Sequence, residues 1–183
     1  MNKAELLLKY LPMAPVGPVF EVGCLRSEFE SEEDGYSTLY LLKYCTDNDI
    51  NFISIDNDKD TVELAKKVLN QHRLDEERIL LGDGAETIKK LDRNISFLYL
   101  DSHKDPVYTL EQYKAACLNK GAILIIDDSQ PIERWQFGKA TLVKNVFDKY
   151  KVEYKIITTL PGYSALIAIM PQRKPAGKLI WEQ

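Results

Sequence analysis

The stretch FLYLDSHKDPVYTLEQYKAACLNKGAILIID, residues 97–127, decides the fold. It begins and ends with short, almost wholly apolar runs, 97–101 and 122–127, and residues 107–119 between them carry apolar side chains at helical spacing. Continuous apolar runs are typical of strands that are covered on both faces. The stretch therefore predicts two buried parallel strands joined by a helix through a right-handed crossover.

The same alternation continues on both sides of this unit. Further strands are predicted over 19–24, 52–56 and 79–81, and helices over 36–48, 59–73, 85–92 and 139–150. Two β-rich runs then follow, 153–160 and 163–170, and the turn between them is too short for anything but antiparallel neighbours. The sequence predicts an α/β, Rossmann-like fold: a seven-stranded, mostly parallel sheet with a closing antiparallel hairpin and helices on both faces. A plain dinucleotide-binding fold is disfavoured because its sixth strand is parallel.

Length and composition indicate one domain, predicted over 1–170, with a tail over 171–183 that we expect to leave the domain surface. The net charge of −4 gives no reason to expect nucleic acid as a partner. No apolar run approaches the roughly 20 residues that span a bilayer. The start, MNKAELLLKYLP, is predicted to be an amphipathic helix and not a signal peptide. Three scattered cysteines favour buried, reduced thiols in a cytoplasmic protein.

Acidic residues lie at the carboxyl ends of all five predicted parallel strands, the edge at which open α/β sheets bind ligands. Such carboxylates repel one another unless cations or hydroxyl-rich ligands lie between them. They are Glu21, Asp56, Asp83, Asp101 and the pair Asp127–Asp128.

Asp56 has two interpretations, since it could accept both hydroxyls of a ribose or belong to the cap of the next helix. Gly23 and Gly35 are separated by an acidic insert, which makes a phosphate ligand unattractive and a sulfonium cation easier to accept.

The cluster of Asp101 with Asp127 and Asp128 is the sharpest candidate site. Neighbouring parallel strands lie about 4.8 Å apart, so these three carboxylates can converge on one ion. Oxygen ligands without a nearby Cys or His pair suit a hard cation, magnesium first and calcium or manganese next. The alternative is that the carboxylates cap helices or pair with Lys104 and Arg134.

Over about residues 19–130 the sequence resembles the catechol-type O-methyltransferases, within the class I S-adenosylmethionine-dependent methyltransferases. The matching segments keep the family's order and spacing: EVG (21–23), DGYSTLYLL (34–42), SIDND (54–58), LLGDGAETI (80–88), LYLDSHKDPVY (98–108) and KGAILIIDDS (120–129). LDSHKD together with IDDS is typical of the metal-dependent subgroup.

The resemblance implies a cofactor, S-adenosylmethionine, and a divalent cation. Glu21 and Gly23 would line the methionine end of the cofactor, Ser37 its carboxylate, Asp56 the ribose, and Asp83 with Gly84 the adenine. The remaining cofactor residues would be Gly35, Asn57, Asp101 and Ser102, and the metal ligands would be Asp101, Asp127 and Asp128.

For catalysis, the resemblance implies that Lys104 is the base, and His103 stands where catechol enzymes carry an aromatic gatekeeper. His103 could be a second base, a neighbour of the metal or polar lining. Trp135 and Phe137 could form a wall of the acceptor pocket or belong to a core or interface.

The leading hypothesis is a magnesium-dependent O-methyltransferase that acts on a small molecule with vicinal oxygens, a catechol or a sugar diol. A metal-independent methyltransferase with a nitrogen or single-oxygen acceptor is the second. A non-catalytic cofactor-binding module is the third, favoured by the interrupted glycine loop. A short amino-terminal extension and the tail IWEQ would suit a homodimer.

Overall fold

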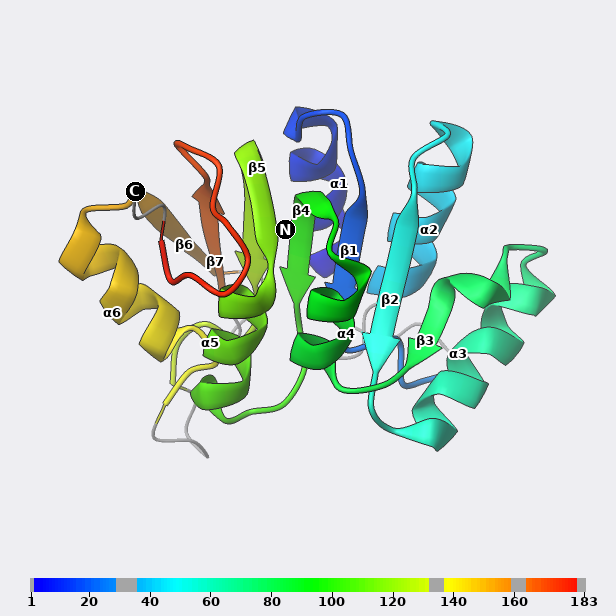
Figure 1. Ribbon diagram of the computed structural model, residues 1–183. Helices are drawn as coiled ribbons and strands as arrows, with labels where there is room; N and C mark the ends of the chain where they lie inside the picture. The colour runs from blue at the N-terminus through cyan, green and yellow to red at the C-terminus, as the bar shows by residue number, and fades with distance from the viewer. Residues whose placement is uncertain (1, 29–35, 132–136, 159–163, 181–183) are drawn as a thin grey trace.

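The computed structural model describes residues 2–28, 36–131, 137–158 and 164–180, and within them the chain forms a seven-stranded sheet of order β3-β2-β1-β4-β5-β7-β6 (Figure 1). Five strands are parallel to one another, and β7 enters antiparallel to both β5 and β6. The predicted fold class and the antiparallel hairpin are confirmed. The strands are β1 (Val19–Val22), β2 (Phe52–Asp56), β3 (Ile79–Leu81), β4 (Asn94–Leu100), β5 (Cys117–Ile126), β6 (Tyr154–Thr158) and β7 (Ser164–Ile169).

Helices cover both faces of the sheet, as predicted. One face buries side chains of α1 (Lys3–Tyr10), α2 (Ser37–Asp47) and α3 (Lys59–Gln71). The opposite face buries side chains of α4 (Gly84–Leu91), α5 (Pro106–Ala115) and α6 (Thr141–Tyr150). Two short 3₁₀ helices, η1 (Leu11–Met13) and η2 (Glu76–Arg78), complete the described elements. The sheet therefore separates two apolar cores, one on each side.

Strand alternation divides the side chains between these two cores. Val19 of β1 packs in the core under α1 to α3, whereas Phe20 and Val22 pack in the core under α4 to α6. Glu21 shares the face of Val19 and is fully buried. The carboxyl ends of β1 to β5 meet along one edge of the sheet, the lower edge in Figure 1, and the candidate site lies there.

The helix predicted over 107–119 ends earlier, at Ala115, and β5 begins at Cys117. Ala116 has an extended backbone, with φ −68° and ψ 134°. Cys117 and Leu118 then pair with Asn94 and Ile95 of β4. Apolar residues at helical spacing continue to Leu118, but the gain from strand pairing beside β4 prevails over the helical pattern.

The expectation that the tail leaves the domain surface was wrong. The backbone N–H groups of Leu118 and Lys174 each donate to the other's carbonyl at 2.8 Å, and Ile180 is buried in the core under α4 to α6. The Lys174 side chain is fully buried, and its ammonium donates to the carbonyls of Lys114, Ala116 and Pro175. A lysine and an isoleucine in a polar-looking segment are thus packed against the sheet.

The predicted first helix and the predicted buried, unpaired thiols are confirmed within the described residues. α1 is helical with a capping box between Asn2 and Glu5, and it buries Leu6, Leu7 and Tyr10. The three cysteines, Cys24, Cys45 and Cys117, are buried and form no disulfide. Among the described helices, none has the length and apolar character needed to cross a membrane.

Candidate functional site

A cavity of about 580 Å³ opens at the carboxyl edge of the sheet. Most of the residues around it lie at or just after the ends of β1, β2, β3 and β4, so the strand order itself brings them together. Residues predicted to bind the cofactor that line it are Gly23, Asp56, Asn57, Asp83, Gly84 and Ser102, and the two predicted catalytic residues, His103 and Lys104, line it as well. The other lining residues are Val22, Arg26, Ile55, Asp58, Thr61, Gly82, Tyr108 and Gln112.

Asp56 is fixed by backbone groups from two sides of the cavity. One carboxylate oxygen accepts the N–H of Cys24 at 3.1 Å, and the other accepts the N–H of Asp58 at 2.9 Å. Asp58, not Asp56, caps α3, since its side chain accepts the N–H groups of Asp60 and Thr61. Because each carboxylate oxygen has more than one lone pair, Asp56 can still accept hydroxyl groups from a ligand.

Gly23 permits the sharp turn after β1. Its φ is +94°, and a Cβ built on it would lie 2.4 Å from the carbonyl oxygen of Asp101. The next backbone groups are held by the neighbouring elements: Gly23 N–H donates to Ile55 O at 2.8 Å, and Leu25 N–H donates to Thr38 Oγ1 at 2.8 Å. The turn is thus ordered through these bonds although the second predicted glycine, Gly35, lies outside the described residues.

Asp83 and Gly84 form the wall after β3. Asp83 caps α4 by accepting the N–H of Glu86 at 2.9 Å. Gly84 is packed against β1, because a Cβ there would lie 2.5 Å from Val22 Cγ1. Ser102, after β4, donates its hydroxyl to Gln112 of α5 at 2.9 Å. These contacts fix the positions of Asp83, Gly84 and Ser102 at the cavity.

Glu21 and Ser37 are not among the described residues that line the cavity. Both are buried, and the Ser37 hydroxyl donates to Glu21 at 2.6 Å, as does the Ser54 hydroxyl. Burial raises the pKa of Glu21 to about 7, although the serine hydroxyls counteract the shift. The two residues therefore bind one another inside the protein and not the cavity.

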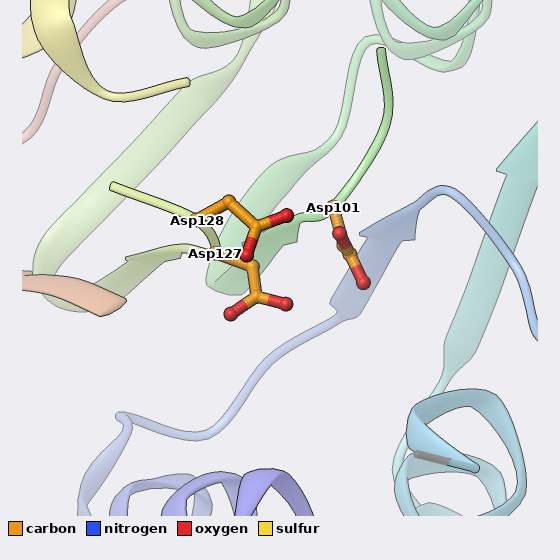
Figure 2. A group of neighbouring side chains, drawn as sticks. All are labelled: Asp101, Asp127 and Asp128. Atoms are coloured by element: carbon orange, nitrogen blue, oxygen red, sulfur yellow. The ribbon is translucent and has the colours of Figure 1, made fainter. Parts of the chain in front are cut away.

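The three carboxylates predicted to hold a metal do converge: oxygens of Asp101, Asp127 and Asp128 lie within 4.8 Å of one another at the ends of β4 and β5 (Figure 2). Two lysines, however, bind them. Lys3 Nζ lies 3.0 Å from Asp101 Oδ2 and 2.7 Å from Asp127 Oδ2. Lys139 Nζ lies 2.5 Å from Asp101 Oδ1 and 3.1 Å from Asp128 Oδ2.

The charges in this cluster shift one another's protonation. Burial favours the neutral form of Asp101, but the ammonium groups of Lys139 and Lys3 prevail and hold its pKa well below the usual range. Burial, together with repulsion by Asp101, raises the pKa of Asp127 to about 6. The Tyr99 hydroxyl lies 3.2 Å from Asp127 Oδ2 and, because of burial and the nearby carboxylates, has a pKa well above normal.

A divalent ion does not fit this cluster while the lysines keep these positions. Both oxygens of Asp101 and one oxygen each of Asp127 and Asp128 already face an ammonium group. One observation favours a further ligand, because Asp128 Oδ1 is buried and has no hydrogen-bond partner among the described residues. The donor set suits magnesium by its chemistry, but an ion would have to displace both lysines.

His103 and Lys104 are exposed at the rim of the cavity. His103 Nδ1 accepts the N–H of Asp105 at 3.1 Å, so the proton of a neutral imidazole lies on Nε2. The ring centroid of His103 lies 5.0 Å from that of Tyr108. In this geometry His103 can therefore donate a hydrogen bond from Nε2.

Residues 132–136, which include Arg134 and Trp135, lie outside the described residues. Phe137 is 55% exposed and is not among the described residues that line the cavity. Three cations of the site were missed by sequence reasoning. Lys3 lies in a predicted surface helix, Lys139 follows the fifth parallel strand by 13 positions, and Arg26 lies in the acidic insert, so none carries a recognisable spacing signal.

Comparison with known proteins gives similarity of structure without similarity of sequence. No protein-family model matches the chain, and no curated protein matches it. A Streptococcus mutans protein solved in complex with S-adenosylhomocysteine has a TM-score of 0.66 at 12% identity, covering 92% of this chain and 98% of that one.

Two further solved structures agree with it. A methyltransferase from Geobacter sulfurreducens has a TM-score of 0.62 at 19% identity, covering 91% of this chain and 76% of that one. TrmK of M. capricolum, solved with the cofactor product S-adenosylhomocysteine, has a TM-score of 0.60 at 15% identity, covering 96% of this chain and 70% of that one. The chain thus has the fold of the class I S-adenosylmethionine-dependent methyltransferases.

Proposed function

We propose that this chain is an S-adenosylmethionine-dependent methyltransferase that methylates a small molecule. The observation that carries the proposal is Asp56, whose carboxylate is fixed by two backbone N–H groups at the wall of the cavity, at the end of β2. A carboxylate in that place suits the two hydroxyls of a ribose. Similar folds hold S-adenosylhomocysteine, which supports a nucleoside with an amino-acid tail as the ligand.

The charges along the cavity favour one orientation of this cofactor. Asp56, Asn57 and Asp83 offer acceptors for the ribose and adenine end. The guanidinium of Arg26 lines the same cavity and donates to the carbonyl of Asp101 at 3.1 Å. We assign Arg26 to the cofactor carboxylate, because the hydroxyl of Ser37, which the family resemblance suggests for that role, donates to Glu21 instead.

His103 and Lys104 stand at the rim, where an acceptor would approach the sulfonium. Methyl transfer is an in-line displacement, so holding the nucleophile and the methyl group in line supplies much of the acceleration. Lys104 is the proposed base for a hydroxyl acceptor. His103, with its proton on Nε2, is proposed to orient the acceptor by donating a hydrogen bond.

Magnesium-dependent O-methylation of vicinal oxygens, a catechol or a sugar diol, is the second candidate. It is favoured by the convergence of Asp101, Asp127 and Asp128 and by the unpaired Oδ1 of Asp128. The bound lysines oppose it, and a single-oxygen or nitrogen acceptor needs no ion.

A small-molecule acceptor is proposed over nucleic acid because the net charge is −4. That the chain acts in the cytoplasm, away from membranes and as a homodimer stays a prediction of the sequence.

Calorimetry with S-adenosylhomocysteine tests the cofactor site. We expect binding by the wild type and a loss of at least about tenfold in affinity for Asp56→Ala, since a charge-assisted hydrogen bond contributes about 1.5–3 kcal/mol. Asp60→Ala is the matched control, because Asp60 also lies near the start of α3 but does not line the cavity. A wild type that binds no S-adenosylhomocysteine would contradict the proposal.

Methyl transfer is then measured with labelled S-adenosylmethionine against catechols, sugar diols, single-hydroxyl compounds and amines. Binding of the cofactor product without turnover of any acceptor class would favour the non-catalytic module.

A further inference from the structure

The acidic cluster at the ends of β4 and β5 is neutralised in large part by two lysines of the same chain. Three carboxylates within 4.8 Å of one another, mostly screened from water, would repel strongly without cations between them. Lys139 is 4% exposed and lies among them, and Lys3 reaches them from the first turn of α1. Two ammonium groups carry the same total charge as one divalent ion.

The two lysines also reproduce the connections that an ion would make. Lys3 bridges Asp101 and Asp127, and Lys139 bridges Asp101 and Asp128. Each lysine therefore joins the end of β4 to the end of β5. Asp101 takes part in both links, since Lys3 binds its Oδ2 and Lys139 binds its Oδ1. A shared metal ion would tie the same two strand ends together.

Adding an ion to this arrangement would reverse the local charge. With both lysines in place, the cluster carries one negative charge when all three carboxylates are ionised, and a divalent ion would make it positive. Mg²⁺ also demands oxygen ligands at about 2.0–2.1 Å in octahedral geometry, and ammonium groups now lie against those oxygens.

We propose that Lys3 and Lys139 take the place of a divalent ion in this chain, so that methyl transfer, if the function proposed above holds, requires no metal. The acceptor then binds without chelation, which favours a single nucleophilic oxygen or nitrogen over vicinal oxygens. Lys3 and Lys139 act as positioning residues, because they hold Asp101, whose carbonyl is contacted by Arg26 at the cavity.

Binding of Mn²⁺, monitored by electron paramagnetic resonance spectroscopy, tests the proposal without any need for turnover. We expect no Mn²⁺ binding to the wild-type protein, and an unchanged affinity for S-adenosylhomocysteine in EDTA and in excess Mg²⁺. The double variant Lys3→Met with Lys139→Met keeps the apolar length of the side chains but exposes the three carboxylates. It should gain Mn²⁺ binding, and Mg²⁺ should raise its melting temperature.

The matched control is Lys67→Met with Lys144→Met, which removes two lysines that each pair with one carboxylate, Glu28 and Asp148. It should gain no Mn²⁺ binding. Tight Mn²⁺ binding by the wild type would overturn the proposal, as would a folded double variant that binds none. If the double variant does not fold, the wild-type measurement and the two single variants decide. Failure of the proposed function would appear separately, as loss of S-adenosylhomocysteine binding in the wild type.

Discussion

The carbonyl oxygen of Asp101 occupies the place where any side chain on Gly23 would begin. A Cβ on Gly23 would lie 2.4 Å from that oxygen and 2.7 Å from the carbonyl carbon. The backbone just after β1 therefore packs directly against the backbone just after β4, where the side chain of Asp101 binds Lys3 and Lys139. The contact ties the floor of the cavity to the charged cluster.

Gly23→Ala should be far more damaging than an alanine at another glycine with a similar backbone. Gly177, with φ +73°, has no atom within 4 Å of a built Cβ, so Gly177→Ala should cost about 1 kcal/mol from the left-handed backbone alone. Gly23→Ala should cost at least about 2 kcal/mol more, because the backbone of Asp101 must move. Urea unfolding of both variants measures the difference, and equal losses would contradict the close contact.

Arg26→Ala should weaken binding of the methionine end of the cofactor without affecting binding of its adenosine end. If its guanidinium binds the carboxylate of the methionine tail, affinity for S-adenosylhomocysteine should fall by about tenfold. Adenosine has no carboxylate, so its affinity should stay unchanged. Calorimetry with both ligands checks this, and an equal loss for both would show that Arg26 acts on the shape of the cavity instead.

Glu21→Gln should remove a pH dependence of stability. Glu21 has a pKa of about 7 in the folded chain against an ordinary 4.5, so the folded state binds more protons between these values. The contribution of Glu21 to stability is therefore fully present below pH 4.5 and is lost as the pH rises through about 7, by roughly 3 kcal/mol at most. Gln can keep contacts with Ser37 and Ser54 without the buried charge, by accepting from one hydroxyl through Oε1 and donating to the other through Nε2.

The variant should consequently be more stable than the wild type at pH 8 and similar to it near pH 4.5. Chemical unfolding at the two pH values measures this difference. Glu63→Gln, in an exposed pair with Lys59, should leave the wild-type dependence in place. If the wild type loses no stability relative to Glu21→Gln between pH 5 and 8, the carboxylate is ionised without cost and the prediction is wrong.

Asp83 combines a structural bond with a predicted role at the adenine, and two substitutions separate them. Asp83→Ala removes the cap of α4 and should destabilise the protein by about 1 kcal/mol, whereas Asp83→Ser keeps a capping oxygen and most of the stability. Affinity for S-adenosylhomocysteine should fall in both variants. Normal binding by Asp83→Ser would limit Asp83 to its capping role.

Ile180→Ala should destabilise the domain by about 2–4 kcal/mol, because Ile180 is 4% exposed and packs in the core under α4 to α6. Lys178→Ala, an exposed change in the same segment, should stay within about 0.5 kcal/mol of the wild type. Thermal unfolding of the two variants tests the packing, and a neutral Ile180→Ala would restore the expectation that the tail leaves the surface.

Most of the fold could be predicted because its strands are buried on both faces and read as continuous apolar runs. The bounds of β2 (Phe52–Asp56) and β3 (Ile79–Leu81) agree with the predicted ranges. The start of β5 was missed because Cys117 and Leu118 also fit helical spacing, and the buried tail was missed because a lysine that donates to three carbonyls looks polar in sequence.

The candidate site was predictable to the extent that it follows strand order. Asp56, Asp83 and Lys104 meet at one cavity because parallel strands end at one edge. Glu21 points into the core under α1 to α3, whereas its neighbour Val22 lines the cavity. This direction follows from strand alternation, which the motif alone did not reveal. Lys3 and Lys139 could not be found, since pairing between the first helix and the segment before α6 depends on tertiary packing.

The position of β7 (Ser164–Ile169) between β5 and β6 (Tyr154–Thr158) has a consequence for how the protein is made. While the ribosome is still translating this part of the message, β5 has an unpaired edge on the side away from β4. Closing that edge requires contacts between segments about 40 residues apart, which slows folding and exposes an aggregation-prone strand. Nascent chains should therefore depend on chaperones until this strand has emerged from the exit tunnel.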